Sequence, residues 1–417
     1  MSHFTTLQSL LSGMTAALDL SDGRTSSHYE RTAYLSYRIA EECGLTAKEC
    51  RRALYRSLMI GAAEYLKECS YTARNLHENA VYLKDIGKTM RQLLPRTWQE
   101  PGGPAQDAAE LHPTLKSAAK FIPKPFLLDG IIALARKLEP EIRYGEPALK
   151  QGEQACRTVI ESGRLSRELR VVTERLAKRD LVWMDLALGK ELLGTLIGKE
   201  ISLNLDEAVS LSQLIALIID FRSPFTRMHS AGVAASAVSL AELLGMSAEE
   251  QKKMAIAGNL HDLGKLRVPA SIIEKNGKLT EEEFALVKEH PYFTYQILKR
   301  IEGFGEIAEW AGWHHEKMNG KGYPFGLPER ELPLGTRIMS AADVFSALTE
   351  ERPYRKALPK EKVLDILREN VEAGSLSRGI TELLSANYEK IDSARREASS
   401  AAGKRYLQAG MKQSETS

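Results

Sequence analysis

Five of the nine histidines lie within 87 residues of the C-terminal half of this 417-residue chain. They are His229, His261, His290, His314 and His315. Two carboxylates, Asp262 and Asp343, lie in the same stretch. A single histidine on an apolar helix is usually a buried core residue, but this combination indicates a metal centre. Imidazole and carboxylate ligands suit Fe, Mn or Zn.

Seven ligands exceed what one metal ion with an open coordination position needs, so they favour a pair of ions. Two ions about 3.5 to 4 Å apart can share a carboxylate, lower the pKa of a bound water and stabilise a leaving oxygen. His261 and Asp262 end a helix expected over 254–260, and Lys265 should share the face of His261. The set therefore predicts hydrolysis of a phosphodiester.

Several separated motifs resemble the HD-GYP family. They are HDLGK at 261–265, EHP at 289–291, HHEKMNGKGYP at 314–324, ADVFSALT at 342–349 and RPYR at 352–355. The resemblance runs from about Asp220 to Leu384. It implies an all-α, metal-dependent phosphodiesterase that opens cyclic dinucleotides, chiefly cyclic di-GMP to linear pGpG. Further cleavage to GMP is left open.

Matched by position, the resemblance implies two ligand sets bridged by Asp262. The first set is His229, His261, Asp262 and Asp343, and the second is His290, His314 and His315. It implies two divalent ions, Fe or Mn, with Asp262 and Lys265 as the catalytic groups. Lys265 is implied to meet the scissile phosphate, where a point charge offsets developing negative charge.

The resemblance also implies dinucleotide contacts outside the ligand sets. They are Lys265, Gly322, Tyr323, Arg352 and Arg355. A simple loop tyrosine and two solvated arginines are the alternative interpretations of the last three. Gly320 and Gly322 are expected to shape the loop, because glycine allows positive φ and close backbone approach.

The chain departs from the family pattern at three positions. Phe225 stands four residues before His229, where some members carry a Glu that recruits a third metal, so two ions are expected here. Asn319 and Ser346 replace aspartates and could change hydrogen bonding around the ligands. Mixed 3′,3′-cyclic GMP-AMP or another phosphate ester is therefore an alternative substrate. A non-hydrolysing cyclic-dinucleotide receptor or signalling adaptor is the alternative of a different class.

Helical periodicity dominates the elements that must position these groups. Apolar residues from Val233 to Leu244 follow one helical face, and Gly245 should stop that helix. Ser247 with Glu250, and Thr280 with Glu283, fit capping boxes. Pro359 should open a further helix. The sequence therefore predicts an all-α fold.

An internal repeat is found when the chain is shifted by 201 residues. Residues 40–49 then match 241–250 at five of ten positions, and His28 falls on His229. Chance similarity of two capped helices is the alternative. His261 and Asp262 fall on Ile60 and Gly61, so the first copy should be catalytically inactive. His77 and His112 are expected to be surface residues.

Length and repeat together predict two related HD-type helical domains in tandem. We expect a degenerate regulatory or structural domain over 1–190, containing a loop at 101–104, the HD-GYP domain over 191–395, and a flexible tail over 396–417. A protein partner or a homodimer could use the first domain.

Composition narrows the class of protein further. Hydrophobic residues make up 43% of the chain and charged residues 27%, with a formal charge of +2, so no DNA or RNA polymer is expected as partner. The four cysteines form no CxxC pair, which argues against disulfides and thiolate metal ligands. Without a long apolar run or a secretory signal, the sequence predicts a cytoplasmic protein that does not enter the membrane.

Overall fold

A computed structural model of the chain describes most of its 417 residues. The described residues are 3–21, 27–69, 124–143, 147–163, 165–188, 192–196, 202–220, 228–273, 275, 277–351 and 357–408. Helices dominate, which confirms the all-α prediction. None of the described helices is both long and apolar enough to cross a bilayer. The expected loop at 101–104, with His77 and His112, lies outside the described residues.

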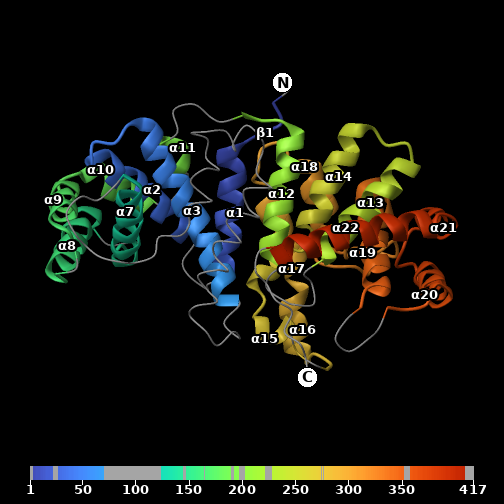
Figure 1. Ribbon diagram of the computed structural model, residues 1–417. Coiled ribbons are helices and arrows are strands. Elements are labelled where there is room, and N and C mark those ends of the chain that lie inside the picture. The colour runs from blue at the N-terminus through green and yellow to red at the C-terminus, as the bar shows by residue number, and fades with distance from the viewer. Residues whose placement is uncertain are drawn as a thin grey trace.

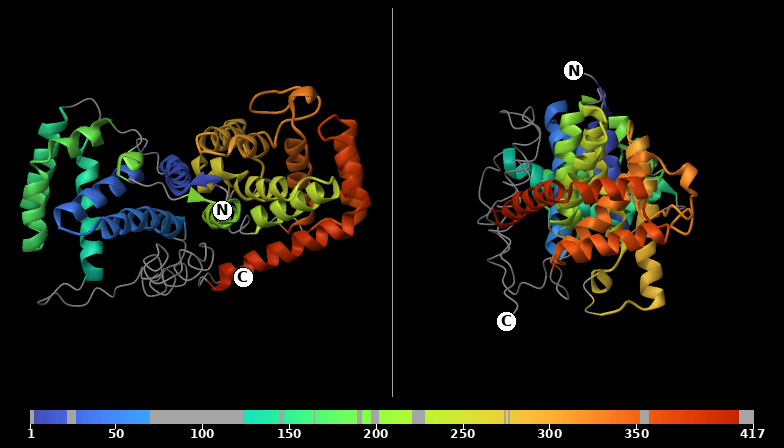
Figure 2. Two further views of the ribbon diagram at one scale, coloured as in Figure 1. Left: turned by 90° about the horizontal axis from the view of Figure 1, so that it is seen from above. Right: turned by 90° about the vertical axis from the view of Figure 1, so that its right-hand side faces the viewer.

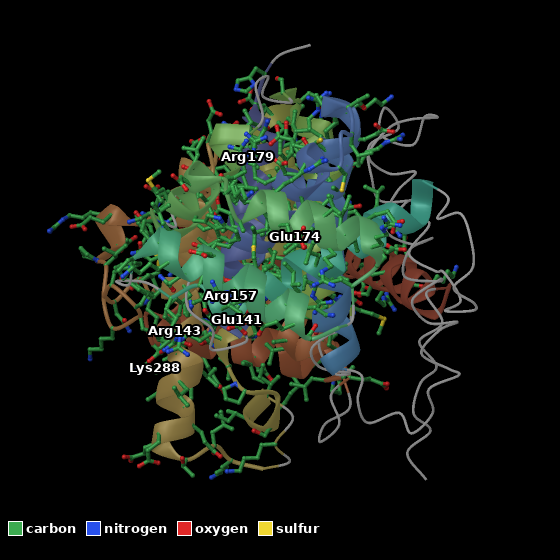
Figure 3. The ribbon with its side chains drawn as sticks, turned by 90° about the vertical axis from the view of Figure 1, so that its left-hand side faces the viewer. Glu141, Arg143, Arg157, Glu174, Arg179 and Lys288 are labelled. Carbon is green, nitrogen blue, oxygen red and sulfur yellow. The ribbon has the colours of Figure 1, made fainter. Side chains whose placement is uncertain are left out.

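The elements of the first half form one lobe of the molecule, on the left in Figure 1, with β1 and α1 at the centre of the view. They are β1 (Thr5–Thr6), α1 (Leu7–Ser21), α2 (His28–Glu42), α3 (Ala47–Cys69), α7 (Lys124–Leu138), η1 (Glu139–Glu141), α8 (Ala148–Glu161), α9 (Arg167–Leu176), α10 (Asp180–Leu188) and α11 (Leu192–Leu196). Charged side chains such as Arg157, Glu174 and Arg179 cover its outer end (Figure 3).

The second half forms the other lobe. Its elements are β2 (Ser202–Leu203), α12 (Leu205–Asp220), α13 (His229–Leu243), α14 (Ala248–Leu260), η2 (Leu263–Arg267), α15 (Ala270–Ile273), α16 (Glu281–Lys288), α17 (His290–Leu298), α18 (Gly305–Gly312), η3 (Glu329–Glu331), α19 (Leu334–Thr349), α20 (Lys360–Glu372), α21 (Arg378–Ala386) and α22 (Tyr388–Gln408). Helix α13 packs against α14, α19 and α22.

Local sequence signals set several helix ends as expected. Helix α13 ends at Leu243, and Gly245 has φ 72°. Both predicted capping boxes form, at the starts of α14 and α16. Pro359 precedes the first residue of α20. These ends depend on capping side chains or on the backbone preferences of Gly and Pro, so they can be predicted from the local sequence alone.

The internal repeat is visible in the helix boundaries. Helices α2 and α13 each have 15 residues and begin at His28 and His229, which are 201 residues apart. The next helices, α3 and α14, begin at the same offset. Asp19 accepts a hydrogen bond from the backbone N–H of Tyr29, and Asp220 does the same for Ser230. The two halves thus share a pair of helices, and in each half an aspartate accepts a hydrogen bond from the start of the first of these helices.

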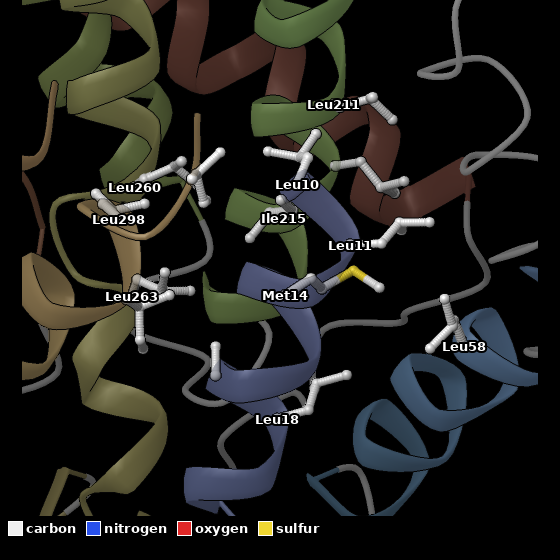
Figure 4. Close-up of a cluster of buried hydrophobic side chains, with 14 of the residues drawn as sticks. Leu10, Leu11, Met14, Leu18, Leu58, Leu211, Ile215, Leu260, Leu263 and Leu298 are labelled. Atoms are coloured by element: carbon white, nitrogen blue, oxygen red, sulfur yellow. The ribbon is translucent and has the colours of Figure 1, made fainter. Parts of the chain in front are cut away.

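The N-terminal helix α1 joins the two halves. It packs against α2 and α3 of its own half and against η2 and α17 of the other half. Leu10 and Met14 of α1 lie in one buried cluster with Leu260 and Leu263 (Figure 4). Strand β1 pairs antiparallel with β2, with Thr5 opposite Leu203. The sequence-based division at residue 190 stays a prediction, and α1 contacts both sides of it.

Helix α22 extends beyond the point where we expected a flexible tail. It continues to Gln408 and runs along the second half (Figure 2). The hydroxyl of Ser399 donates to the carbonyl of Met228, 3.2 Å away, next to the start of α13. Residues 396–408 are therefore helical, and 409–417 lie outside the described residues.

Candidate metal centre

His229 is the first residue of α13, and the end of α12 fixes its position. The carboxylate of Asp220, the last residue of α12, accepts hydrogen bonds from the Ser230 hydroxyl at 2.6 Å and the Ser230 N–H at 3.3 Å. A carboxylate at a helix start satisfies a free backbone donor and is favoured by the helix dipole. The His229 side chain is thereby held in the interior, where it is 5% exposed.

His261 and Asp262 lie where α14 gives way to the short 3₁₀ helix η2. The Thr294 hydroxyl donates to the carbonyl of His261 and accepts from the N–H of Gly264, both at 2.9 Å. A Cβ added to Gly264 would lie 2.0 Å from the carbonyl oxygen of His290. Only glycine fits this approach, which brings the His261 loop beside the start of α17.

Lys265 lies in η2 rather than on a continued α-helix, so it does not simply share the face of His261 as expected. The tighter 3₁₀ turn brings residues i and i+3 into line. As a result the Lys265 ammonium lies 2.6 Å from Oδ2 of Asp262.

Seven side chains from separate elements converge on one interior region. They are His229 of α13, His261 and Asp262 before η2, His290 of α17, His314 and His315 after α18, and Asp343 of α19. Three groups have ligand atoms within 4.8 Å of one another. These are His290 with His314 and His315, His229 with His261 and Asp343, and His261 with Asp262 and His314. Asp262 therefore stands between two three-residue groups.

The histidine rings are oriented by hydrogen bonds on one side and turn the other side inward. Nδ1 of His261 lies 2.8 Å from the carbonyl of Gly258, and Nδ1 of His314 lies 2.6 Å from that of Ala311. A carbonyl only accepts, so Nδ1 carries the proton and Nε2 presents a lone pair. Both Nε2 atoms are buried and have no hydrogen-bond partner among the described residues.

Burial keeps most of these imidazoles neutral. It lowers the pKa of His261 and His314, and together with His290 it lowers the pKa of His315 to about 3. Neutral imidazole is the form that binds metal ions. Buried lone pairs without a donor are costly, and a cation would satisfy them.

The carboxylates remain charged despite their burial. Burial opposes the charged form of Asp262, yet His261 and Lys265 hold its pKa well below the usual range. Burial also opposes the imidazolium of His229, but Glu350 and Asp343 raise its pKa to about 10. This part of the site therefore favours a positive charge, which a proton or a metal ion can supply.

This donor set fits divalent metal ions. Buried neutral imidazoles with inward lone pairs surround two ionised carboxylates, and such nitrogen and oxygen donors suit Fe, Mn or Zn. Structural zinc centres instead use thiolates in many cases, and Cys43, Cys50 and Cys156 belong to the other half.

Tyr323 borders this region on a loop that Glu316 holds in shape. The Tyr323 ring lies 4.9 Å from the ring of His315. The buried carboxylate of Glu316 accepts from the backbone N–H groups of Phe325 at 2.7 Å and Leu327 at 3.0 Å. A Cβ added to Gly322 would lie 2.4 Å from Cα of Glu316, so close packing requires glycine there.

Comparisons with known proteins find an HD domain and relatives that are phosphodiesterases. Residues 213–375 match the family model described as HD domain. The 3′3′-cGAMP-specific phosphodiesterase 1 of Vibrio cholerae is 29% identical over 395 residues, 87% of each chain. The cyclic di-GMP phosphodiesterase response regulator RpfG of Xanthomonas campestris is 39% identical over 163 residues, 39% of this chain and 43% of that protein. The part of the chain that matches the HD domain is thus similar to cyclic-dinucleotide phosphodiesterases of the HD-GYP type.

A solved structure extends the likeness to the fold of the whole chain. The cyclic GMP-AMP specific phosphodiesterase V-cGAP3 of V. cholerae superposes with a TM-score of 0.59 at 21% identity, covering 92% of this chain and 98% of that one. At this identity the likeness concerns the fold alone, and it includes the first half as well as the HD-GYP half.

Two departures from the HD-GYP pattern differ in their surroundings. The Asn319 side chain donates to the carbonyl of Ala373 at 2.7 Å and accepts from the N–H of Lys321 at 2.9 Å. It therefore ties the Tyr323 loop to the end of α20. Ser346 is fully buried in α19, and its hydroxyl has no hydrogen-bond partner in the described part of the chain. Phe225, Arg352 and Arg355 lie outside the described residues.

Four residues around the HD-GYP site were not singled out from the sequence. Thr294 and Glu316 support two loops, and Glu350 contacts His229 at 2.9 Å. Lys288 of α16 lies with its ammonium 5.1 Å from the centre of the Tyr323 ring. Lys288, Thr294 and Glu316 lie within four residues of a predicted ligand, which was the available signal. Glu350 had no such signal, because its partner His229 lies 121 residues away.

Proposed function

We propose that this chain hydrolyses a phosphodiester bond of a cyclic dinucleotide at a pair of divalent metal ions. The observation that carries the proposal is the convergence of buried imidazole lone pairs on Asp262, which stands between two groups of possible ligands. Such a donor set at the centre of an HD-domain phosphodiesterase suits two ions that share one carboxylate.

The proposed ligands divide as the structure groups them. His229, His261 and Asp343 would hold one ion, and His290, His314 and His315 the other, with Asp262 bridging. We propose Fe or Mn as the ions, as the resemblance to the HD-GYP family implies, and the nitrogen and oxygen donors suit both. When bound, the pair supplies Lewis-acid activation of water and of the phosphate.

The residues of the chain contribute positioning and charge. The ammonium of Lys265 contacts the side chain of Asp262, the residue before η2. The flexible side chain can move this positive charge from Asp262 to a phosphate oxygen. Tyr323 offers a ring face beside His315, on which a base or a sugar can pack. Burial of the ligands limits the access of bulk water and strengthens each of these charges.

Two cyclic dinucleotides are candidate substrates. Cyclic di-GMP phosphodiesterases share the HD domain with this chain, as RpfG does over 163 residues. The relative that aligns along 87% of the chain, including the first half, is named for 3′3′-cGAMP. This full-length similarity supports the mixed dinucleotide as substrate alongside cyclic di-GMP.

We propose that the first half binds no metal pair. The side chains of His28 and Glu139 are in buried contact there, and the guanidinium of Arg31 lies 3.2 Å from the same carboxylate. Arg31 is 1% exposed and stands where the second half has Gly232. The guanidinium of Arg31 already neutralises the carboxylate of Glu139, so the negative charge there is balanced without a metal ion.

The test is chromatography of the products formed from each of the two cyclic dinucleotides by protein purified without oxygen. We expect a linear dinucleotide in the presence of Mn²⁺ or Fe²⁺ and none after chelation. Tight binding of either dinucleotide without product, in protein that holds two ions, would instead support the receptor interpretation. Hydrolysis of neither, with no binding, would contradict the proposal.

A further inference from the structure

Glu350 makes a contact that sets His229 apart from the other histidines of the metal centre. Oε2 of Glu350 lies 2.9 Å from Nδ1 of His229. The corresponding nitrogens of His261, His290 and His314 lie against the backbone carbonyls of Gly258, Val287 and Ala311. His229 therefore has an ionisable carboxylate behind it, whereas His261, His290 and His314 have neutral acceptors.

The geometry fixes which side of His229 faces the centre. A carboxylate accepts a hydrogen bond, so the contact with Glu350 favours a proton on Nδ1. Nε2 then faces Asp343, whose Oδ1 is 3.2 Å away. Glu350 follows the last residue of α19, and Asp343 lies two turns earlier on the same helix. Helix α19 and the residue that follows it thus supply both Asp343, a proposed ligand, and Glu350, the carboxylate that contacts His229.

The backbone around Glu350 leaves room for this contact. A Cβ added to Gly232, on the first turn of α13, would lie 3.2 Å from Oε1 of Glu350 and 2.9 Å from the hydroxyl of Ser399. The side chain of Glu350 is 14% exposed, so it is largely removed from competing water. A buried, charge-assisted hydrogen bond of this kind is stronger than one in solvent.

The same pair occurs in the first half. Nδ1 of His28 contacts the carboxylate of Glu139, and His28 begins α2 as His229 begins α13. Glu139 follows the last residue of α7, as Glu350 follows that of α19. The first half lacks the His261 and Asp262 counterparts but retains this pair. A glutamate that follows a helix therefore contacts the first histidine of the repeated helix in both halves, although the two glutamates are not equivalent under the 201-residue shift.

We propose that Glu350 is a positioning residue that orients His229 and raises its basicity toward the metal ion it binds. The proposal rests on the metal pair of the proposed function and adds an asymmetry to it. Carboxylate partners behind metal-binding histidines strengthen binding, and their loss weakens affinity by about 10 to 100-fold. The ion nearest His229 should depend on Glu350, and the ion among His290, His314 and His315 should not.

The test is titration of chelator-stripped, full-length protein with Mn²⁺ alone, for the wild type, Glu350→Gln and Glu350→Asp. We expect Glu350→Gln to weaken one of two binding events by about 10 to 100-fold and leave the other unchanged. Glu350→Asp, which keeps the charge, should restore part of the loss. Glu351→Gln is the matched control, since the neighbouring Glu351 is exposed and loses the same charge.

Three results would overturn the proposal. Glu350→Gln could bind both ions as the wild type does. It could weaken both ions equally together with a lower melting temperature, which would make Glu350 a structural residue. Equal weakening in Glu351→Gln would show a general effect of charge. Failure of the wild type to bind any Mn²⁺ would contradict the proposed function itself, so the two ideas fail differently.

Discussion

The ammonium nitrogen of Lys265 lies 2.6 Å from Oδ2 of Asp262, the carboxylate that stands between the two groups of proposed ligands. The side chain of Lys265 is 27% exposed, whereas that of Asp262 is 3% exposed. Lys265 therefore forms the partly open side of an otherwise buried charge pair, where a substrate phosphate can meet it.

Replacing Lys265 should impair turnover more than metal binding. We expect Lys265→Met to lower kcat by about 10² to 10³-fold, because it removes a positive charge at the developing phosphate charge. Metal content should stay at the wild-type value, as Lys265 donates no lone pair. Steady-state kinetics with metal analysis of the same sample measures both. Wild-type kcat in Lys265→Met would refute the role, and Lys252→Met, on the exposed face of α14, is the control.

Glu316 should act through the loop that carries Tyr323. Glu316→Gln leaves an amide where a buried carboxylate accepts several backbone N–H groups, including those of Phe325 and Leu327. Hydrogen bonds to a charged group contribute about 1.5 to 3 kcal/mol, so the free energy of unfolding should fall by about 2 kcal/mol. The displaced Tyr323 should raise KM for the dinucleotide.

Thermal denaturation and kinetics of Glu316→Gln test this role. Glu329→Gln serves as the comparison, because the Glu329 side chain is 62% exposed and makes only a distant pair with Arg337. An unchanged KM in Glu316→Gln, at full stability, would show that the loop needs no such support.

The ion pair of the first half should matter for stability and not for metal binding. Arg31→Met leaves the buried Glu139 without its guanidinium, which should cost about 3 to 5 kcal/mol of unfolding free energy. The number of bound metal ions per chain should not change. Chemical denaturation and metal analysis give the two values. A gain or a loss of a bound ion in Arg31→Met would contradict this prediction, and a loss would also contradict the separation of the two halves.

Asp19 should give the stability a pH dependence of known sign. Burial raises the pKa of Asp19 to about 6, against opposing hydrogen bonds from Tyr29 and Ser27. The folded state then holds a proton that the unfolded state has released between about pH 4 and 6. The free energy of unfolding therefore falls as pH rises through this window, by up to about 3 kcal/mol.

The comparison of wild type with Asp19→Asn isolates this effect. The difference between their urea midpoints should change between pH 4.5 and 7. The midpoint of the wild type should fall relative to that of Asp19→Asn as pH rises. Asp180→Asn, at an exposed residue, should follow the wild type at each pH. A difference that is flat over this range would mean that Asp19 titrates normally.

Local signals in the sequence predicted more of the fold than of the contacts around the site. The end of α13 and the cap of α14 could be predicted because Gly245 and Ser247 act on backbone groups within four residues. The offset of 201 residues predicted the equivalent helix pairs. The packing of α1 on η2 had no such signal, because it joins segments more than 200 residues apart through apolar surface alone.

The residues of the site also differ in how far the sequence predicted their roles. The motif pattern indicated the proposed ligands, because their residue types are unusual for a buried region. The roles of Glu316 and Glu350 were not predicted, because a glutamate in a loop or after a helix is ordinary until its partner is known. Glu350 meets His229 across 121 residues, and Glu316 meets backbone groups 9 to 11 residues on.

The most direct test of the central claim is metal content and turnover measured on the same samples of wild type and Asp262→Asn. Two divalent ions per chain are expected in the wild type, with hydrolysis of a cyclic dinucleotide that chelation abolishes. Asp262→Asn should keep fewer than two ions and show no hydrolysis above background. Full turnover in Asp262→Asn, or turnover by a metal-free wild type, would contradict the account.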